Sequence, residues 1–282
     1  RSLITARTNT LGVLLPDLYG EFFSEVIRGI DQTARGGEYH LIVSSSHNEQ
    51  PDIEAALKAM RGRVDGLIVM SPHVNAASLT RSLPSTLPAV LLNCATGDEA
   101  FDSVGIDNRG GAASMVRHLL ELGHRRIAVI KGTANNFDSA ERLAGYRELM
   151  QEAGTYDARL EANGDFTEES GYRAAQHLVA QTPRPTAIFA FNDSMAAGAL
   201  SALQDAGLRV PEDVSVGGFD DVPMSAYLNP PLTSVHVPIA ALGASAMSCL
   251  LEAIRTQNRH ERTTRTLETT LILRRSTGMA SA

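Results

Sequence analysis

Short runs of β-branched and aliphatic residues alternate with amphipathic helical periods along the whole chain, and this alternation restricts the fold more than any other feature. It is typical of a parallel sheet whose strands are joined by crossover helices. A first series of predicted strands covers 11–15, 39–44, 66–70, 89–92 and 103–106. A second series covers 126–130, 159–163, 186–190, 214–219 and 232–236. Two successive series predict an α/β protein with two similar lobes.

Helical periods fill the intervals between these strands. The predicted helices cover 22–35, 51–62, 74–83, 109–122, 139–153, 168–181 and 193–206. A long helical pattern at 238–256 and a last strand at 266–273 follow the second series. These late elements have no neighbours of their own in the sequence. We therefore expect them to return to the earlier lobes, which makes both domains discontinuous.

The chain has 282 residues, enough for two domains of ordinary size. We predict crossings between the lobes near Asp107, Pro238 and Leu267. The predicted parts are a linker at 1–8, an N-terminal lobe at 9–107 and 238–267, a C-terminal lobe at 108–237 and 268–277, and a tail at 278–282.

Composition and charge exclude several classes of protein. The formal net charge is −7, so the chain should bind nucleic acid poorly by itself. No apolar run approaches the roughly 20 residues that cross a bilayer, and no signal-like segment opens the chain, which argues against a membrane protein and weakly against a secreted one. Cys94 and Cys249 lie far apart without CxxC spacing, which favours free thiols of a reducing cytoplasm over a disulfide.

The motifs of common enzyme classes are absent from the sequence. There is no GxxxxGK[ST] phosphate loop, no HExxH, no GxSxG and no cluster of Cys and His. The eight histidines are scattered, and Gly110-Gly111 lacks the third glycine of a dinucleotide-binding loop. We therefore predict no catalytic residue, no metal site and no cofactor.

Aromatic and hydrogen-bonding residues recur at the carboxyl ends of the predicted strands, where open α/β sheets bind ligands. Aromatic rings can cover the C–H faces of a sugar, while Asp, Asn and Arg bind its hydroxyls, and a nucleoside could use the same groups. The candidate ligand-binding residues are Asp17, Phe22, Phe23, Asn93, Asn136, Asp138, Arg142, Phe166, Phe189, Phe191, Asn192 and Asp220.

Each candidate also has a structural interpretation. Phe22, Phe166 and Phe189 could be ordinary core residues, Asp17 a turn residue, and Arg142 half of a surface ion pair. The convergence of polar groups on strand ends in both lobes favours a ligand site. We also expect Arg142 and Asp220 to line a solvent-open crevice, so that the fold survives their replacement.

Segments of the chain resemble, in the same order, those of the lactose/galactose repressor family of bacterial transcription regulators. The resemblance extends from Arg1 to about Thr277. RSL at the start matches the family's hinge, although three residues alone could equally be a frayed terminus. The similar segments are RSLITARTNTLGVLLP, GRVDGLIVM, SVGIDNRGG, LGHRRIAVIKG, RLAGYRE, GDFTEESGYRAA, PTAIFAFNDSMAAGAL, AGLRVPEDVSVGGFDD, NPPLTSVHVP and LILRRST.

The resemblance implies two Rossmann-like lobes of the periplasmic-binding-protein type I architecture, with the ligand cleft between them. Leu3 matches the hinge leucine that enters the DNA minor groove, and the family's N-terminal helix-turn-helix is missing from this chain. By position, the family's effector contacts fall on Phe22, Phe23, Arg142, Phe166, Asn192 and Asp220.

Two departures from the family pattern bear on the ligand. Asn93 stands where several relatives have aspartate, and Asn136 stands where a purine-responsive relative has arginine. These departures weaken the case for a purine base and favour a neutral effector, above all a sugar.

The sequence thus predicts the effector-binding and dimerisation core of a cytoplasmic, ligand-responsive repressor. The predicted partners are a small-molecule effector, a second copy of the chain, and operator DNA reached only through the missing helix-turn-helix. No heptad pattern follows Thr277, which favours a dimer over a tetramer. The main alternative is a periplasmic-type sugar-binding protein of a transport system, and an enzyme acting on a sugar or nucleoside is a third. An upstream helix-turn-helix would support the repressor, and an upstream signal peptide the transport protein.

Overall fold

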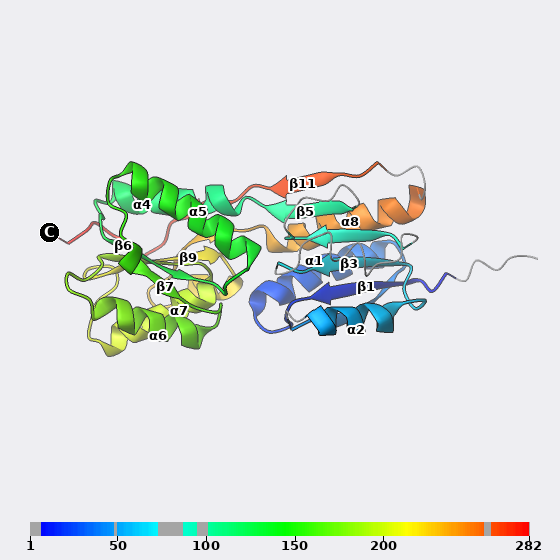
Figure 1. Ribbon diagram of the computed structural model, residues 1–282, viewed down its shortest axis with the longest axis horizontal. Coiled ribbons are helices and arrows are strands. Elements are labelled where there is room, and N and C mark those ends of the chain that lie inside the picture. The colour runs from blue at the N-terminus through cyan, green and yellow to red at the C-terminus, as the bar shows by residue number, and fades with distance from the viewer. Residues whose placement is uncertain (1–6, 48–49, 73–86, 95–100, 257–260, 282) are drawn as a thin grey trace, which may run out of the picture. The chain divides into compact units, whose positions relative to one another are not determined.

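The computed structural model describes residues 7–47, 50–72, 87–94, 101–256 and 261–281 (Figure 1). The chain forms two compact units. Unit 1 comprises Arg1–Ile106 and Pro238–Leu267, and unit 2 comprises Asp107–Val237 and Glu268–Ala282. Each unit contains one six-stranded sheet with helices, so the predicted α/β class with two parallel-sheet lobes is confirmed. Leu3 and the predicted helix at 74–83 lie outside the described residues.

The sheet of unit 1 is parallel throughout, in the order β11-β5-β4-β3-β1-β2. Every residue of β3 and β4 is buried, as expected for parallel strands covered on both faces. The strands are β1 (Thr10–Leu15), β2 (His40–Ser45), β3 (Gly66–Met70), β4 (Ala89–Leu92), β5 (Asp102–Ile106) and β11 (Thr264–Leu267).

The described helices of unit 1 are α1 (Glu21–Gly36), α2 (Gln50–Met60) and α8 (Ile239–Thr256). In Figure 1 the orange α8 lies among the blue and cyan elements of unit 1. A Cβ at Gly29 would overlap the carbonyl oxygen of Ala240, so this glycine allows α1 and α8 to pack closely. Among the described helices α8 alone is long and apolar enough to cross a membrane, but its contacts with α1 and the sheet make it a core helix.

The sheet of unit 2 has the order β12-β10-β9-β8-β6-β7, and only β12 is antiparallel to its neighbour. Its central strands β8 and β9 are buried along their whole length. The strands are β6 (Ile127–Lys131), β7 (Glu161–Asn163), β8 (Ala187–Ala190), β9 (Ser215–Asp220), β10 (Thr233–His236) and β12 (Thr270–Ile272).

The four long helices of unit 2 each begin at a side-chain cap. Asp107, Asn136, Thr167 and Asn192 precede these helices, and each accepts a hydrogen bond from an amide three residues later. The helices are α4 (Asn108–Glu121), α5 (Phe137–Glu152), α6 (Glu168–Val179) and α7 (Asp193–Asp205), with short 3-10 helices η1 (Ala158–Leu160) and η2 (Pro223–Tyr227).

The end of the chain differs from the prediction in two ways. The strand predicted at 266–273 is two strands, because the chain passes from unit 1 to unit 2 between Leu267 and Glu268. The segment predicted as a tail is attached to unit 2: the Gly278 amide donates to Ser215 Oγ (3.0 Å) and the Ala280 amide to the Leu122 carbonyl (2.9 Å). In the middle of the chain, the strand predicted at 159–163 begins as η1, and only its last three residues form β7.

Candidate functional site

The adjacent strands β6, β8 and β9 bring several predicted site residues to one edge of the unit 2 sheet. Their carboxyl ends lie side by side because the strands are parallel neighbours. Asp220 is the last residue of β9, Phe191 directly follows β8, and Asp138 and Arg142 lie in the first turns of α5, which follows β6. With Asn108 at the start of α4, the side chains of Asp138, Arg142 and Asp220 form what we call the arginine cluster.

Arg142 is the centre of this cluster. Its Nε donates to Asn108 Oδ1 (2.7 Å), its Nη1 to the Phe191 carbonyl, and its Nη2 to Asp220 Oδ1 (3.3 Å). The guanidinium carbon lies 3.7 Å from the centre of the Phe219 ring, a cation–π contact. Among the described residues these bonds use three of the five N–H donors of Arg142, which leaves donor capacity for a ligand.

The cluster holds more acid than base. Asn108 Nδ2 donates to Asp138 Oδ1 (2.8 Å), so one amide joins Asp138 to Arg142. Burial raises the pKa of Asp138 against the opposing effect of Arg142. The pKa of Asp220 is raised to about 8, mainly by burial and also by the neighbouring Asp193 and Asp138, against the opposing effect of Arg142. One guanidinium thus faces two buried carboxyl groups whose pKa values are raised.

The expectation of a solvent-open crevice for Arg142 and Asp220 is wrong for the structure as described. Arg142 is 3% exposed and Asp220 is 6% exposed. The cause is the packing of Phe219 and Asn108 around the guanidinium. Replacement of Arg142 should therefore affect stability as well as binding.

The backbone at Asp220 is strained. Asp220 has φ 101° and the following Asp221 has φ 52°, two consecutive residues in the left-handed region that non-glycine residues rarely occupy. Such strain persists only where surrounding contacts hold it, and it gathers at functional sites. The strained backbone therefore marks the end of β9 as a candidate functional position.

Phe166 and Asn192 are joined at the same edge. Asn192 caps α7 by accepting from the Met195 amide (2.9 Å), and its Nδ2 donates to the Phe166 carbonyl (2.9 Å). The Phe166 ring lies against Gly132, where a Cβ would overlap it, so glycine is needed directly after β6. Asn136 caps α5 by accepting from the Ser139 amide (2.8 Å).

Phe189 and Phe191 are core residues as the structure stands. Both are fully buried, and their rings pack edge to face with centres 5.3 Å apart. Phe191 still serves the cluster through its backbone carbonyl, which accepts from Arg142.

The unit 1 candidates lie at the carboxyl edge of their own sheet. Asp17 Oδ1 accepts from the Leu18 amide (2.6 Å) and the Tyr19 amide (3.1 Å), which makes it an exposed turn residue after β1. Phe22 and Phe23, in the first turn of α1, are half-buried and pack edge to face at 5.4 Å.

Asn93 is the most informative of the unit 1 candidates. It follows β4, has φ 46° and is 2% exposed. Neither its Oδ1 nor its Nδ2 has a hydrogen-bond partner in the part of the chain that the structure describes. An unpaired buried amide typically costs about 1–3 kcal/mol, so such a group needs an explanation. A polar ligand at this edge would supply the missing bonds.

Sequence reasoning missed Asn108 and Phe219. Asn108 lies at the start of α4, and Phe219 lies next to Asp220 on β9. A polar residue directly after the cap Asp107 was the available signal for Asn108. For Phe219 no local signal distinguishes a core ring from one that faces a guanidinium.

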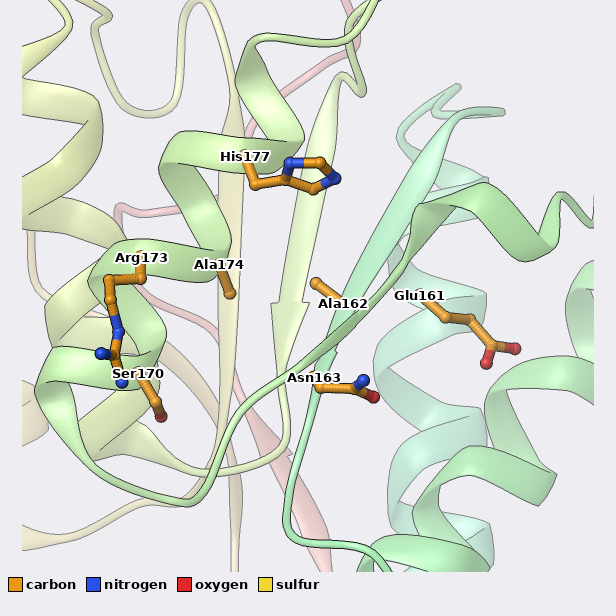
Figure 2. A pocket seen from close by; sticks show the side chains of 7 residues that line it. All are labelled: Glu161, Ala162, Asn163, Ser170, Arg173, Ala174 and His177. Atoms are coloured by element: carbon orange, nitrogen blue, oxygen red, sulfur yellow. The ribbon is translucent and has the colours of Figure 1, made fainter.

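A groove of about 370 Å³ lies elsewhere on unit 2, between the edge strand β7 and α6. In Figure 2, Ala162 and Ala174 face each other across it, while the Glu161 carboxylate points away from it. That carboxylate already accepts from Arg147 (2.7 Å), Tyr156 (2.9 Å) and Lys131 (3.2 Å). None of the groove's lining residues was predicted as a ligand contact. Among the described residues no group of three or more His, Cys, Asp or Glu is arranged to hold a metal.

Comparison with known sequences gives the family. The family described as "periplasmic binding protein-like domain" matches residues 116–277. The HTH-type transcriptional repressor PurR of Erwinia tasmaniensis is 38% identical over 281 residues, which is 98% of this chain and 82% of that protein. Catabolite control protein A of Priestia megaterium is 35% identical over 254 residues, 89% of this chain and 76% of that protein. The chain belongs to the lactose/galactose repressor family.

Solved structures of lactose/galactose repressors and related regulators have the same fold. A complex of the transcriptional regulator CelR with cellobiose covers 96% of this chain and 85% of its own, with 32% identity and a TM-score of 0.87. A LacI family regulator from Enterococcus faecium with bound ribose covers 96% of this chain and 100% of its own chain, with 27% identity and a TM-score of 0.87. The lac repressor dimer bound to operator covers 98% of this chain and 96% of its own chain, with 26% identity and a TM-score of 0.88.

Proposed function

We propose that this chain is the effector-sensing core of a cytoplasmic transcriptional repressor and that its effector is a small neutral polyhydroxyl compound, most simply a sugar. The arginine cluster at the carboxyl edge of the unit 2 sheet carries the proposal. Relatives support the proposal in two ways. The similar proteins named above are transcriptional regulators, and two structural neighbours hold cellobiose and ribose. The repressor relatives also favour this function over that of a transport-associated binding protein.

The chemistry of the cluster favours a ligand with hydroxyl groups. Arg142 keeps donor capacity, and Asp220 uses only Oδ1 to accept from it, so each can bind a hydroxyl. Burial raises the pKa of both Asp138 and Asp220, and a protonated carboxyl group both donates and accepts hydrogen bonds, which suits a neutral ligand with hydroxyl groups. Phe166 supplies an aromatic face and Asn192 an amide at the same edge.

For unit 1 we propose Asn93 as a polar contact and Phe22 and Phe23 as apolar contacts. Asn93 supports this role best, because its buried amide offers two donors and an acceptor that described residues leave unused. Asp17, Asn136 and Asp138 are proposed as supporting residues that shape the loops, since each already holds backbone or side-chain partners.

Control of repression by an effector requires that the effector bind two conformations of the protein with different affinities. A ligand that binds both conformations equally shifts no equilibrium, however tightly it binds. We propose that the strained Asp220 turn is one place where the two states differ in their affinity for the effector.

A thermal-shift screen of pentoses, hexoses, disaccharides and nucleosides tests the proposal. A ligand at 100 times its Kd adds about 2.7 kcal/mol of stability, which raises the Tm of a protein of this size by roughly 5 °C. We expect at least one sugar to do so. A shift produced by purine bases or anionic compounds alone would contradict the proposed effector class.

We expect this 282-residue chain to bind operator DNA negligibly at physiological salt. Its net charge of −7 repels phosphate, and phosphate contacts supply most non-specific affinity. Gel-shift titration with an operator fragment is the measurement, and fusion to a relative's helix-turn-helix is the positive control. A sequence-specific shift at nanomolar concentration of the unfused chain would count against the proposal.

We expect a homodimer in solution, as in the structure of the lac repressor dimer. Unit 2 exposes two large apolar side chains on η2, Met224 at 53% and Tyr227 at 82%. We propose that they contribute to the contact, so Tyr227→Asp should weaken the dimer, while Met279→Asp serves as an exposed control. Light scattering at micromolar concentration is the measurement. A monomer in the wild type, or an unchanged dimer in Tyr227→Asp, would argue against this contact.

A further inference from the structure

A further buried carboxyl group, that of Asp193, lies beside the arginine cluster. Asp193 is the first residue of α7 and is 3% exposed. Its Oδ2 accepts from the Val222 amide (2.9 Å) and from Ser225 Oγ (2.5 Å), and its Oδ1 accepts from Ser234 Oγ (2.6 Å). Val222 and Ser225 belong to the segment that directly follows the Asp220–Asp221 turn, and Ser234 lies on the neighbouring strand β10.

The ordinary role of an acidic residue at this position does not explain these bonds. Aspartate in the first turn of a helix usually stabilises the helix N-terminus. Here the cap of α7 is Asn192, which accepts from the Met195 amide. The Asp193 carboxylate instead turns toward β9 and η2, so closely that a Cβ at Gly218 would overlap Oδ1. Asp193 therefore fixes a neighbouring segment.

The segment it fixes is the strained one. The Asp221 amide donates to Ser234 Oγ (3.2 Å), the same hydroxyl that donates to Asp193. The Asp221 carboxylate meets Arg274 (2.7 Å) and His236 (3.0 Å) on its other side. The left-handed residues Asp220 and Asp221 are thus held between Asp193 and the Arg274–His236 pair.

We propose that Asp193 is a positioning residue of the effector site, which holds the Asp220–Asp221 turn so that the Asp220 carboxylate meets the effector correctly. The proposal rests on the proposed role of Asp220 as an effector contact. Asp193 acts through hydrogen bonds to Val222, Ser225 and Ser234, and it touches no ligand itself.

Charge gives Asp193 a second influence on Asp220. The pKa of Asp193 is raised to about 7, mainly by burial and also by Asp221, against the opposing effect of the bonds from Ser225, Ser234 and Val222. Asp193 in turn raises the pKa of Asp220 as a like charge. Asp138 acts on Asp220 in the same direction and Arg142 in the opposite one. Removal of the Asp193 charge should therefore lower the pKa of Asp220.

Amide hydrogen exchange in the ligand-free protein tests the positioning role. Asp193→Ala leaves the Val222 amide without its acceptor, so its exchange should be about tenfold faster or more. Asp193→Asn keeps one oxygen acceptor and should restore most of the protection. Asp213→Ala is the matched control, since Asp213 accepts the Arg209 amide (2.8 Å) just before β9 begins. Unchanged exchange at Val222 in a folded Asp193→Ala variant overturns the proposal.

Calorimetry with cellobiose and D-ribose as probes, together with carbon-13 titration of Asp220, tests the link to the effector. Asp193→Ala should weaken the binding of whichever sugar binds the wild type by about tenfold, and Asp193→Asn should recover most of that affinity. Asp193→Asn should also show a lower pKa for Asp220 than the wild type. An unchanged affinity beside faster Val222 exchange overturns the positioning role. Should neither probe bind, an unchanged pKa of Asp220 in Asp193→Asn overturns it. An unchanged affinity in Asp220→Asn refutes the proposed effector site instead.

Discussion

Replacement of Arg142 by alanine should weaken effector binding roughly 30-fold or more and also destabilise the protein. Removal of a charged partner from a dry polar site typically costs about 2–5 kcal/mol, and 1.4 kcal/mol corresponds to a factor of ten. The variant would remove the bonds to Asn108, Phe191 and Asp220 together. Titration calorimetry with the effector found by screening measures the change in affinity.

The expected loss of stability in Arg142→Ala follows from the buried carboxyl groups that lose their partner. Asp138 and Asp220 would remain buried without their counter-charge, and breaking a buried ion pair in this way costs about 3–5 kcal/mol. Because burial raises the pKa of Asp220 to about 8, its carboxyl group is largely protonated near pH 7, which should keep the loss near the lower end. Urea unfolding measures it.

Arg109→Ala is the matched control for this experiment. Arg109 pairs with Glu148 at 2.9 Å, but both side chains are about half exposed, and such surface pairs contribute about 0–1 kcal/mol. We expect this variant to keep both affinity and stability. If Arg142→Ala behaved like Arg109→Ala in both measurements, the cluster would be neither the site nor a structural element.

Asp220→Asn should weaken effector binding by a similar factor and flatten the dependence of stability on pH. Burial raises the pKa of Asp220 from 3.8 to about 8, so between these values the folded protein holds a proton that the unfolded chain has lost. The unfolding free energy therefore falls as the pH rises through this window. Asparagine cannot titrate, so this part of the fall should vanish.

Urea unfolding at pH 5.5, 7.0 and 8.5 measures the effect. The wild type should lose stability across the series, and Asp220→Asn should lose less. A residual slope is expected, because burial also raises the pKa of Asp193 to about 7. Equal slopes in the two proteins would show that Asp220 is ionised when buried, with Arg142 fully compensating its charge.

The sequence predicted the sheet strands well where hydrophobic runs are bounded by turn residues. The strand expected at 66–70 is β3, and the one expected at 89–92 is β4, because each is a short apolar run buried on both faces. The last strand was predicted poorly. The residues on both sides of Leu267 are β-forming, so the pattern from 264 to 273 predicts one strand there, although a crossing between the lobes is predicted near the same residue.

The sequence predicted where the candidate residues lie on the unit 2 sheet, but it did not predict that Arg142 and Asp220 are buried. Strand ends placed Arg142, Asn192 and Asp220 at one edge of the unit 2 sheet, as parallel topology requires. The burial of Arg142 depends on Asn108, 34 residues earlier, and on Asp220, 78 residues later. Contacts over such separations leave no local signal in the sequence.

The aromatic candidates show the same limit. Phe166 and Phe189 both lie near strand ends in similar local patterns. The structure places Phe189 in the interior of β8, where it is fully buried, whereas Phe166 lies in a loop and remains partly exposed. Only the arrangement of neighbouring strands distinguishes the core ring from the candidate stacking ring.

Titration calorimetry of the wild type, Asp220→Asn and Arg109→Ala with the effector identified by thermal shift tests whether the carboxyl edge of the unit 2 sheet binds the effector. We expect saturable binding of a neutral sugar to the wild type and to Arg109→Ala with equal affinity. Binding should be roughly 30-fold weaker or more for a folded Asp220→Asn variant. Equal affinity in all three proteins would contradict the claim that the carboxyl edge of the unit 2 sheet senses the effector.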